Sequence, residues 1–392
     1  MDTKIKITKT TNGADSEDRA ETAPVRVGVV GLGRSGYGIH LNAFRKHTDT
    51  FLPVAVSDID FDRAQTTAAE FGCAAYASID ELLANDQVEL VVVASTNKFH
   101  APDTITALQA GKHVVCEKPF GLTVADVDAM IAARDAATAK AGHPVLLSPF
   151  QNRRFEEPFQ MVRQIISEGK LGQIIHIRMA YHSFSRRWDW QTVKSFGGGQ
   201  LHNNGPHPID QALIFFADKG VMDSADIEVV SDLRNTLSSG DAEDHVRLTL
   251  RAPKFPKAPS IDIEFFATCA YPQDNWMVMG TSGGLRGSGN TLQYRWVDWS
   301  EEPPRPVTAK STSDRSYNQE KLNWMEETIK MGENSGVPGA APISGLAERF
   351  YANLYAALRT GEPLKVPPEE IRHRIAIIEK ARQYAGQELA VS

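Results

Sequence analysis

The sequence predicts an α/β protein in which a parallel, doubly wound sheet is followed by an α+β domain with a predominantly antiparallel sheet. Short apolar runs alternate with helical stretches over residues 25–147, which is typical of a parallel sheet with helices on both faces. After Pro149, apolar and polar residues alternate in period two, as in half-solvated antiparallel strands. We therefore expect a flexible tail over residues 1–24, a first domain over residues 25–147 and a second over residues 148–392.

The strands of the first sheet are expected as five short apolar runs, over residues 25–30, 52–58, 88–95, 113–118 and 144–149. Two of the helices between them begin with capping-box spacing, at Ser78 with Glu81 and at Thr123 with Asp126. The helix that follows Thr123 is expected to end at Gly142.

The second domain is expected to open with a helix that ends at Gly169. Its period-two segments predict strands over residues 174–183, 244–250 and 261–270. The segment 301–341 is rich in proline, serine and charge, and we expect a long surface excursion there. Two helices should follow, over residues 343–360 and 369–387, the later one packing back on the first domain.

Composition excludes several classes of protein. The chain has 392 residues, of which 42% are hydrophobic and 23% charged, so collagen-like, coiled-coil and wholly disordered proteins are excluded. A net charge of −7 without a dense basic block argues against nucleic acid or an anionic membrane as a partner. The cysteines at 73, 116 and 269 are far apart, which favours a reducing, cytoplasmic location. Neither a transmembrane helix nor a signal peptide is expected.

A glycine-rich turn follows the first strand directly. It has the GxGxxG pattern and consists of Gly31, Leu32, Gly33, Arg34, Ser35 and Gly36. Such a turn lets the backbone approach a pyrophosphate at a helix N-terminus, and Asp58 at the end of the second strand can bind both ribose hydroxyls. The sequence therefore predicts NAD as cofactor in preference to NADP, although Arg63 lies near Asp58. A structural glycine turn with a solvent-facing aspartate is the alternative.

Two further motifs carry a family resemblance. One ends in Glu117-Lys118-Pro119, and the other runs from Gly197 through Asn203, Asn204 and His207 to Asp210. With both, the sequence resembles the glucose–fructose oxidoreductase/inositol dehydrogenase (Gfo/Idh/MocA) family over about residues 25–390. The resemblance implies a Rossmann domain that binds NAD(P). It also implies an open-faced sheet domain that covers the nicotinamide and commonly forms the interface of a homo-oligomer, a dimer or tetramer.

The resemblance also implies catalytic roles. His207 is the candidate base for the hydroxyl proton, and Lys118 is expected to bind the same oxygen, stabilise its negative charge and share in the proton transfer. Taken singly, the two could be a solvated strand-end lysine and a structural histidine. The family usually has aspartate where this chain has Asn203, and an amide cannot accept a proton. Asn203 and Asn204 can still bind sugar hydroxyls.

Other residues match the family's sites less specifically. The predicted cofactor set adds Ser95, Asn97, His100 and Glu117, together with Lys118. The predicted substrate set adds Arg153, His182, Trp188 and Asp189; an indole face packs well against a sugar while a carboxylate takes its hydroxyl bonds. Structural roles remain open for Arg153 and His182, and the tryptophan loop could simply be anchored by its rings.

Two other patterns are set aside. The GxSxG at residues 280–284 is expected to be a hairpin turn because no helix follows it. Histidines 176, 182, 202 and 207 lack metal-site spacing, so no metal is expected. The leading hypothesis is an NAD-dependent oxidoreductase that acts on a secondary hydroxyl or ketone of a sugar, glycoside or cyclic polyol. The alternatives are a glycoside-cleaving enzyme that oxidises C3 transiently, and a non-catalytic NAD-binding sensor.

Overall fold

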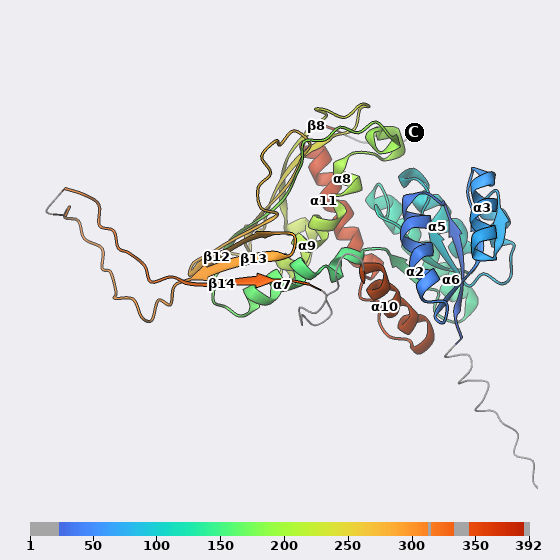
Figure 1. The fold of residues 1–392 in the computed structure, drawn as a ribbon, viewed down its shortest axis with the longest axis horizontal. Coiled ribbons are helices and arrows are strands. Elements are labelled where there is room, and N and C mark those ends of the chain that lie inside the picture. Colours follow the sequence, from blue (N-terminus) through green and yellow to red (C-terminus); the bar gives the residue numbers. More distant parts are fainter. Residues whose placement is uncertain (1–22, 313–314, 333–344, 388–392) are drawn as a thin grey trace, which may run out of the picture.

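The computed structural model describes residues 23–312, 315–332 and 345–387, and it arranges them around two sheets (Figure 1). The tail expected over residues 1–24 lies almost entirely outside the described residues. The first sheet has six parallel strands in the order β3-β2-β1-β4-β5-β6. Its strands are β1 Val25–Val30, β2 Phe51–Ser57, β3 Ala74–Tyr76, β4 Leu90–Val93, β5 His113–Cys116 and β6 Leu147–Pro149. This order reverses between β1 and β4, as in a Rossmann sheet, so the predicted doubly wound fold is confirmed.

Helices cover both faces of the first sheet. One face packs against α4, α5 and α6, and the other against α2, α3 and α10. Their bounds are α2 Asn42–Lys46, α3 Phe61–Phe71, α4 Ile79–Leu83, α5 His100–Gln109, α6 Val124–Ala141 and α10 Leu346–Thr360. The place of α10 was not predicted. Its Tyr351 ring packs edge-on against Phe44 and Phe51 of the first domain.

The predicted helix caps are confirmed in one case and half-confirmed in the other. At α6, Thr123 accepts the Asp126 N–H while the Asp126 carboxylate accepts the Thr123 N–H, a complete capping box. The helix ends at Gly142, which has φ of +73°. At α4, Ser78 accepts the Glu81 N–H, but the Glu81 carboxylate accepts the Ala77 N–H instead.

The second sheet has eight strands in the order β14-β13-β12-β11-β7-β10-β9-β8. All neighbouring pairs are antiparallel except β7 with β10, which are parallel. The strands are β7 Ile174–His182, β8 Glu228–Arg234, β9 His245–Arg251, β10 Ser260–Phe266, β11 Trp276–Gly280, β12 Gly283–Ser288, β13 Thr291–Trp296 and β14 Met325–Lys330. The GxSxG segment is the β11–β12 turn, as predicted.

The expectation of a surface excursion over residues 301–341 is wrong in part. Residues 325–330 return to the sheet as β14, whose backbone pairs with β13 from Met325 to Lys330. β14 was not predicted because five of its six residues are exposed, and apolar and polar residues do not alternate along it. Between β13 and β14 the chain projects far from the body of the protein (Figure 1). Residues 313–314 and 333–344 lie outside the described part.

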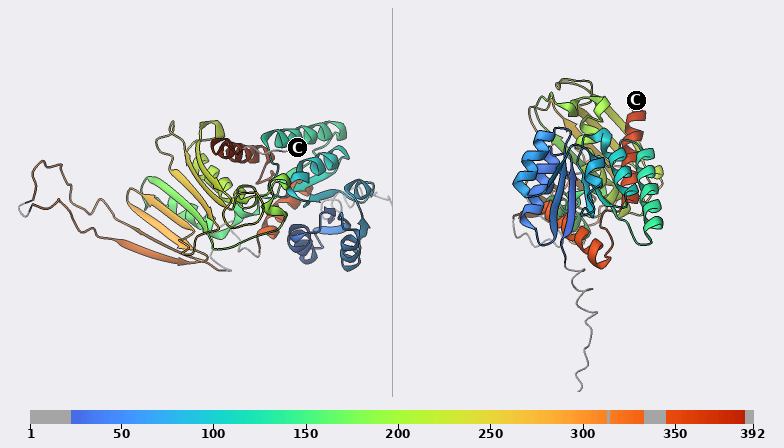
Figure 2. Two further views of the ribbon diagram at one scale, coloured as in Figure 1. Left: turned by 90° about the horizontal axis from the view of Figure 1, so that it is seen from above. Right: turned by 90° about the vertical axis from the view of Figure 1, so that its right-hand side faces the viewer.

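Helices join the two sheets into one body. The inner face of the second sheet shares a continuous hydrophobic core with α7 Glu157–Ser167, α9 Pro206–Ala217 and α11 Pro368–Tyr384. Helix α11 contacts α6 and β6 of the first domain as predicted, and it also contacts α9 and β8. Figure 2 shows the first sheet end-on with helices on either side. Among the described residues, no helix is long and apolar enough to cross a membrane.

Candidate active site

The glycine-rich turn lies between β1 and the helical segment Gly36–Leu41 (η1). Gly31 has φ of +85°, and a Cβ there would lie 2.5 Å from the Ala94 carbonyl oxygen. A Cβ on Gly36 would lie 1.8 Å from the Gly31 oxygen, so β1, β4 and the helix start can meet only if both are glycine. Around Gly33, in contrast, there is nothing within 4 Å of a built Cβ. This open space at the carboxyl end of β1 fits a dinucleotide pyrophosphate.

Asp58 lies beside this turn, at the end of β2. Its carboxylate accepts the Leu32 N–H at 2.8 Å and the Asp60 N–H at 2.9 Å, and Arg63 approaches it at 3.2 Å. Asp58 is 7% exposed, whereas the Arg63 side chain is half exposed. The acidic group predicted for the ribose is therefore held against the phosphate-binding turn, as the dinucleotide fit requires.

Glu117 directly follows β5, and its side chain is buried in the protein. His40 Nε2 lies 3.1 Å from Oε1, the Lys118 N–H donates to Oε2 at 2.9 Å, and His40 Nδ1 contacts the Tyr351 hydroxyl at 2.6 Å. Burial would raise the pKa of Glu117, but the hydrogen bond and charge of His40, together with Lys118, lower it to about 2. The buried carboxylate thus anchors the loop that carries Lys118. Direct contact between Glu117 and the cofactor stays a prediction.

Lys118 reaches across from the first domain to the second. Its ammonium donates to the Asn203 backbone oxygen at 3.0 Å, and the following peptide bond, to Pro119, is cis. Burial lowers the pKa of Lys118; Glu117 opposes this shift, and the positive charges of Arg153, Arg34 and Arg187 add to it. A lysine whose pKa is lowered in this way gives up its proton more readily than an exposed lysine does.

The other predicted cofactor residues tie the neighbouring loops together. Asn97 is buried and donates to the Gly197 oxygen at 2.8 Å. The ring nitrogens of His100 lie 2.7 Å from the Pro119 oxygen and 2.9 Å from the Ser95 oxygen. The Ser95 hydroxyl donates to Asp103. These contacts brace the cis-proline loop, and binding of the cofactor by these side chains stays a prediction.

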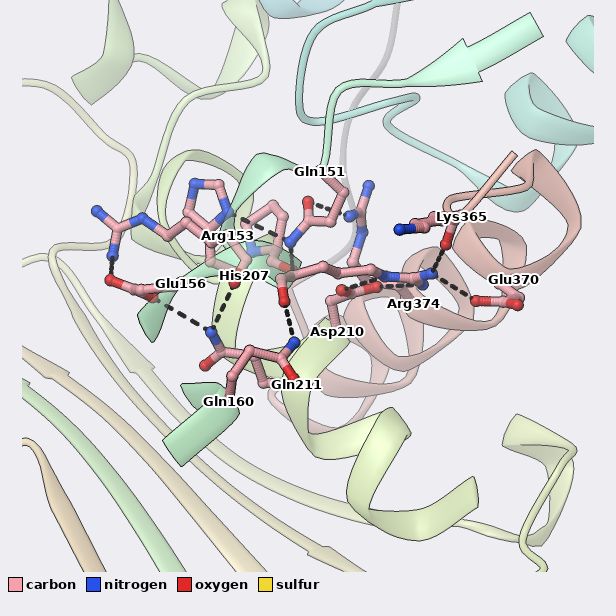
Figure 3. A network of polar contacts seen from close by, with 12 residues as sticks. Gln151, Arg153, Glu156, Gln160, His207, Asp210, Gln211, Lys365, Glu370 and Arg374 are labelled. Atoms are coloured by element: carbon pink, nitrogen blue, oxygen red, sulfur yellow. Dashed lines mark hydrogen bonds and ion pairs between the residues drawn. The ribbon is translucent and has the colours of Figure 1, made fainter. Parts of the chain in front are cut away.

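His207 is the second residue of α9 and is 7% exposed. Its Nδ1 lies 3.3 Å from the amide nitrogen of Gln151, and the amide oxygen of Gln151 accepts from Arg374 at 2.5 Å (Figure 3). The pKa of His207 lies well below its usual value because of burial and then the positive charges of Arg153, Lys118 and Arg374. The imidazole is therefore neutral at pH 7.

A cavity of about 340 Å³ lies beside His207, between α9 and the strands β7 and β10. It brings together four residues of the predicted site, namely Arg153, His182, Asn204 and His207. Its wall also includes polar side chains and two phenylalanines, among them Gln200, Asp244, Asn275, Phe265 and Phe266. Such a mixture of hydrogen-bonding groups and aromatic faces suits a polyhydroxylated ring.

Comparison with known proteins places this geometry in a family. The family model described as an oxidoreductase family with an NAD-binding Rossmann fold matches residues 25–142, and the model of the Gfo/Idh/MocA C-terminal domain matches residues 159–286. The chain belongs to the Gfo/Idh/MocA family. It is an NAD-binding oxidoreductase, and the prediction of NAD as cofactor is confirmed by the family model.

Relatives and solved structures resemble the chain over nearly its whole length. An uncharacterised oxidoreductase of Schizosaccharomyces pombe is 32% identical over 374 residues, which are 91% of this chain and 95% of the relative. The scyllo-inositol 2-dehydrogenase (NADP(+)) of Bacillus subtilis is 25% identical over 95% of this chain and 97% of its own. The Bordetella pertussis WlbA dehydrogenase, solved with NADH and UDP-GlcNAcA, has a TM-score of 0.68 at 20% identity, covering 93% of this chain and 96% of that one.

The asparagine that replaces the usual Gfo/Idh/MocA aspartate has a structural explanation. The Asn203 amide nitrogen donates to the Gln191 backbone oxygen at 3.1 Å, and its amide oxygen accepts from Asn97 at 3.1 Å. An aspartate has no proton to give the Gln191 oxygen, so the amide is required by this loop. Asn203 is buried, and the contact it makes with Lys118 comes from its backbone.

The loop that carries Trp188 and Asp189 does not line the cavity. Trp188 is 78% exposed, and the Asp189 carboxylate pairs with Arg187 and accepts the Gln191 N–H at 2.9 Å. Asp189 thus holds its own loop. His182 does face the cavity, but its Nε2 is 3.0 Å from Glu264 and its ring stacks on Phe266. Sugar binding by these residues remains a prediction.

Sequence reasoning missed the residues that support His207. Gln151 is not among the residues predicted for the site, yet its position just after β6 was a usable signal, because strand ends supply the site in this fold. Arg374 had no such signal, since it lies 223 residues from Gln151. Arg154 also holds α9 in place, by a double hydrogen bond to Asp210 at 2.8 Å for each. Within the described residues, no group of three or more possible metal ligands is found.

Proposed function

We propose that this protein is a dehydrogenase or reductase that transfers hydride between NAD and a secondary hydroxyl or ketone of a sugar, glycoside or cyclic polyol. The observation that carries the proposal is the convergence of Lys118 and His207 on one segment, residues 203–207, beside the polar cavity. The Lys118 ammonium bonds to the backbone of Asn203, and His207 is four residues further along the same turn.

The two side chains suit the chemistry of a carbinol oxygen. When bound, NAD supplies the acceptor or donor of hydride. Loss of hydride from a secondary alcohol requires the hydroxyl proton to leave, so a proton acceptor and a hydrogen-bond donor are needed at the same oxygen. Burial lowers the pKa of both Lys118 and His207, so the neutral form of each is favoured more than in an exposed side chain. Arg153 and Asn204 in the cavity wall can bind the remaining hydroxyls.

The choice of NAD rather than NADP is supported by Asp58. Its buried carboxylate faces the ribose side of the turn and would repel a 2′-phosphate. We expect NAD to bind more tightly than NADP, and quenching of tryptophan fluorescence during titration with each cofactor measures this. Arg63→Met should leave the affinity for NAD little changed. Equal affinities, or tighter binding of NADP, would contradict this assignment.

The experiment that tests the proposed function is a panel of sugars, glycosides and cyclic polyols, followed by NADH absorbance in both directions and by assay for released aglycone. Formation of NADH with one substrate class, lost in Lys118→Met, is the expected result. Aglycone release without net NADH would instead support redox-assisted glycoside cleavage. Binding of NAD without turnover of any compound would support the sensor.

A further inference from the structure

We propose that Gln151 and Arg374 are positioning residues that hold His207 in the tautomer with its proton on Nε2, so that His207 meets the substrate as a hydrogen-bond donor. The inference deepens the proposed function and rests on it for the catalytic consequence. The tautomer itself is a property of the protein alone.

The argument begins at Arg374, in α11. This side chain is 1% exposed, and although burial lowers its pKa to about 10, it remains a cation at pH 7. A guanidinium has only donors, so the atom of Gln151 that lies 2.5 Å from it must be the amide oxygen. The other end of the amide confirms this orientation. Its nitrogen lies 3.3 Å from the Pro206 backbone oxygen, which can only accept.

The orientation of Gln151 then fixes the state of His207. The amide nitrogen, which carries two protons and no lone pair for bonding, faces His207 Nδ1 at 3.3 Å. Nδ1 must therefore be the unprotonated, accepting nitrogen. Because the ring is buried and the cations Arg153 and Arg374 lie near it, a second proton on the ring is disfavoured. A neutral ring with a bare Nδ1 carries its proton on Nε2, which is turned away from Gln151 (Figure 3).

The consequence reverses the roles expected from the sequence. A neutral His207 with a proton on Nε2 cannot take the substrate proton at that nitrogen, but it can donate a hydrogen bond to the carbinol oxygen. The base is then Lys118 in its neutral form, which burial favours by lowering the pKa of this lysine. In alcohol oxidation its Nζ lone pair takes the hydroxyl proton, the carbon gives its hydride to NAD, and the C–O bond becomes a carbonyl whose oxygen keeps the hydrogen bond from His207.

Nuclear magnetic resonance of the full-length protein labelled with ¹⁵N-histidine tests the tautomer directly. Two-bond correlations between the ring protons and nitrogens distinguish a protonated from a bare nitrogen, and the His207 signals are identified by their loss in His207→Phe. We expect a bare Nδ1 and a protonated Nε2 at pH 7. A protonated Nδ1 would overturn the inference whether or not the enzyme is active. The expected tautomer without hydride transfer on any substrate would overturn the proposed function instead.

Substitutions at Gln151 and Arg374 show whether these residues set the tautomer. In Gln151→Glu a carboxylate faces Nδ1, so the proton should move to Nδ1 and the pH dependence of kcat should change with it. Arg374→Met frees the amide to rotate, and a mixture of tautomers is expected, whereas Arg374→Lys keeps a donor and should restore the wild-type pattern. Gln160→Glu, in the same polar network but without contact to His207, is the matched control. An unchanged tautomer in folded Gln151→Glu and Arg374→Met would overturn the inference, and if neither variant folds, the wild-type spectrum still decides.

Discussion

At the scale of single residues, the site depends on a lysine whose charge is made unfavourable by its surroundings. Lys118 is partly buried and lies near Arg153, Arg34 and Arg187, while its hydrogen bond goes to a neutral backbone oxygen. The carboxylate of the neighbouring Glu117 bonds to His40. Its negative charge therefore offsets only in part the effect of burial and of these arginines on the Lys118 ammonium. Such a lysine is suited to cycle between its charged and neutral forms during turnover.

The first prediction concerns the pH dependence of this lysine. Because the pKa of Lys118 is lowered, the neutral form appears at a lower pH than for an exposed lysine, and alcohol oxidation should speed up as the pH rises through that value. Lys118→Arg keeps the positive charge but cannot lose a proton, and kcat for oxidation should fall by about 10²–10⁴-fold. Steady-state rates across pH measure both effects. An arginine variant with the wild-type pH profile would show that Lys118 moves no proton.

The second prediction concerns Asn203. Asn203→Asp should lower the free energy of unfolding by about 1–3 kcal/mol, because a buried carboxylate oxygen would face the Gln191 carbonyl without a hydrogen bond. Denaturant unfolding measures the change. Asn204→Asp is the matched control, since this neighbouring side chain is exposed and bonds only to Gln200, and its effect should be small. A stable Asn203→Asp protein would refute the structural explanation of this asparagine.

Residues in local motifs could be predicted from the sequence, whereas those defined by long-range contacts could not. Lys118 and the glycine turn follow strands directly, so their placement at the sheet edge follows from the fold. His207 comes from a motif of the second domain, and its resemblance to the family gave it a role but not a tautomer. The partner that fixes the tautomer, Arg374, arrives from a helix 223 residues beyond Gln151. The composition of the chain and the spacing of its residues do not predict this contact between Arg374 and Gln151.

At the scale of elements, three segments meet beneath the catalytic loop. The end of β5, the segment η1 and helix α10 contribute Glu117, His40 and Tyr351 to one buried chain of hydrogen bonds. A helix was expected over residues 343–360, but the sequence did not indicate which domain α10 would cover. Likewise β3 has only three residues and β14 no apolar pattern, so both are defined by pairing with a neighbour rather than by their own sequence.

The third prediction tests this buried chain through Glu117→Gln. The pKa of Glu117 is about 2, below its ordinary value of 4.5, so its contribution to stability is fully present above pH 4.5 and is lost as the pH falls toward 2. The free energy of unfolding of the variant should therefore be lower than that of the wild type by about 3 kcal/mol at pH 7. This difference should disappear in acid. Glu70→Gln, which removes an exposed partner of Arg45, should cost less than about 1 kcal/mol. A difference in the free energy of unfolding between wild type and Glu117→Gln that stays constant from pH 7 to pH 3 would contradict the account.

At the scale of the whole molecule, the helices of the described residues leave one face of the second sheet uncovered. Its inner face lies in the shared core with α7, α9 and α11, and the residues that alternate with those core residues point the other way. Met279 on this outer face is 47% exposed, and its neighbour Met277 is partly exposed. An uncovered sheet face that carries these two methionines is a surface suited to a second copy of the chain.

The fourth prediction is therefore a homo-oligomer that uses this face. Light scattering during size-exclusion chromatography should give a mass of two or four times 43.1 kDa. Met279→Glu places a charge on the outer face without touching the core, and it should shift the mass toward that of one chain. Tyr271→Glu, at a 90% exposed residue between β10 and β11, serves as the control. A wild-type protein that runs as a single chain at micromolar concentration would contradict the prediction.

The most direct test of the central claim follows the hydride itself. A substrate found in the panel is prepared with deuterium on its carbinol carbon and incubated with NAD and the enzyme, and the reduced cofactor is analysed by mass spectrometry. The account predicts that the cofactor carries one deuterium per turnover and that Lys118→Arg forms almost none. Product formation with deuterium released to solvent, or with a cofactor that gains none, would contradict direct hydride transfer at this site.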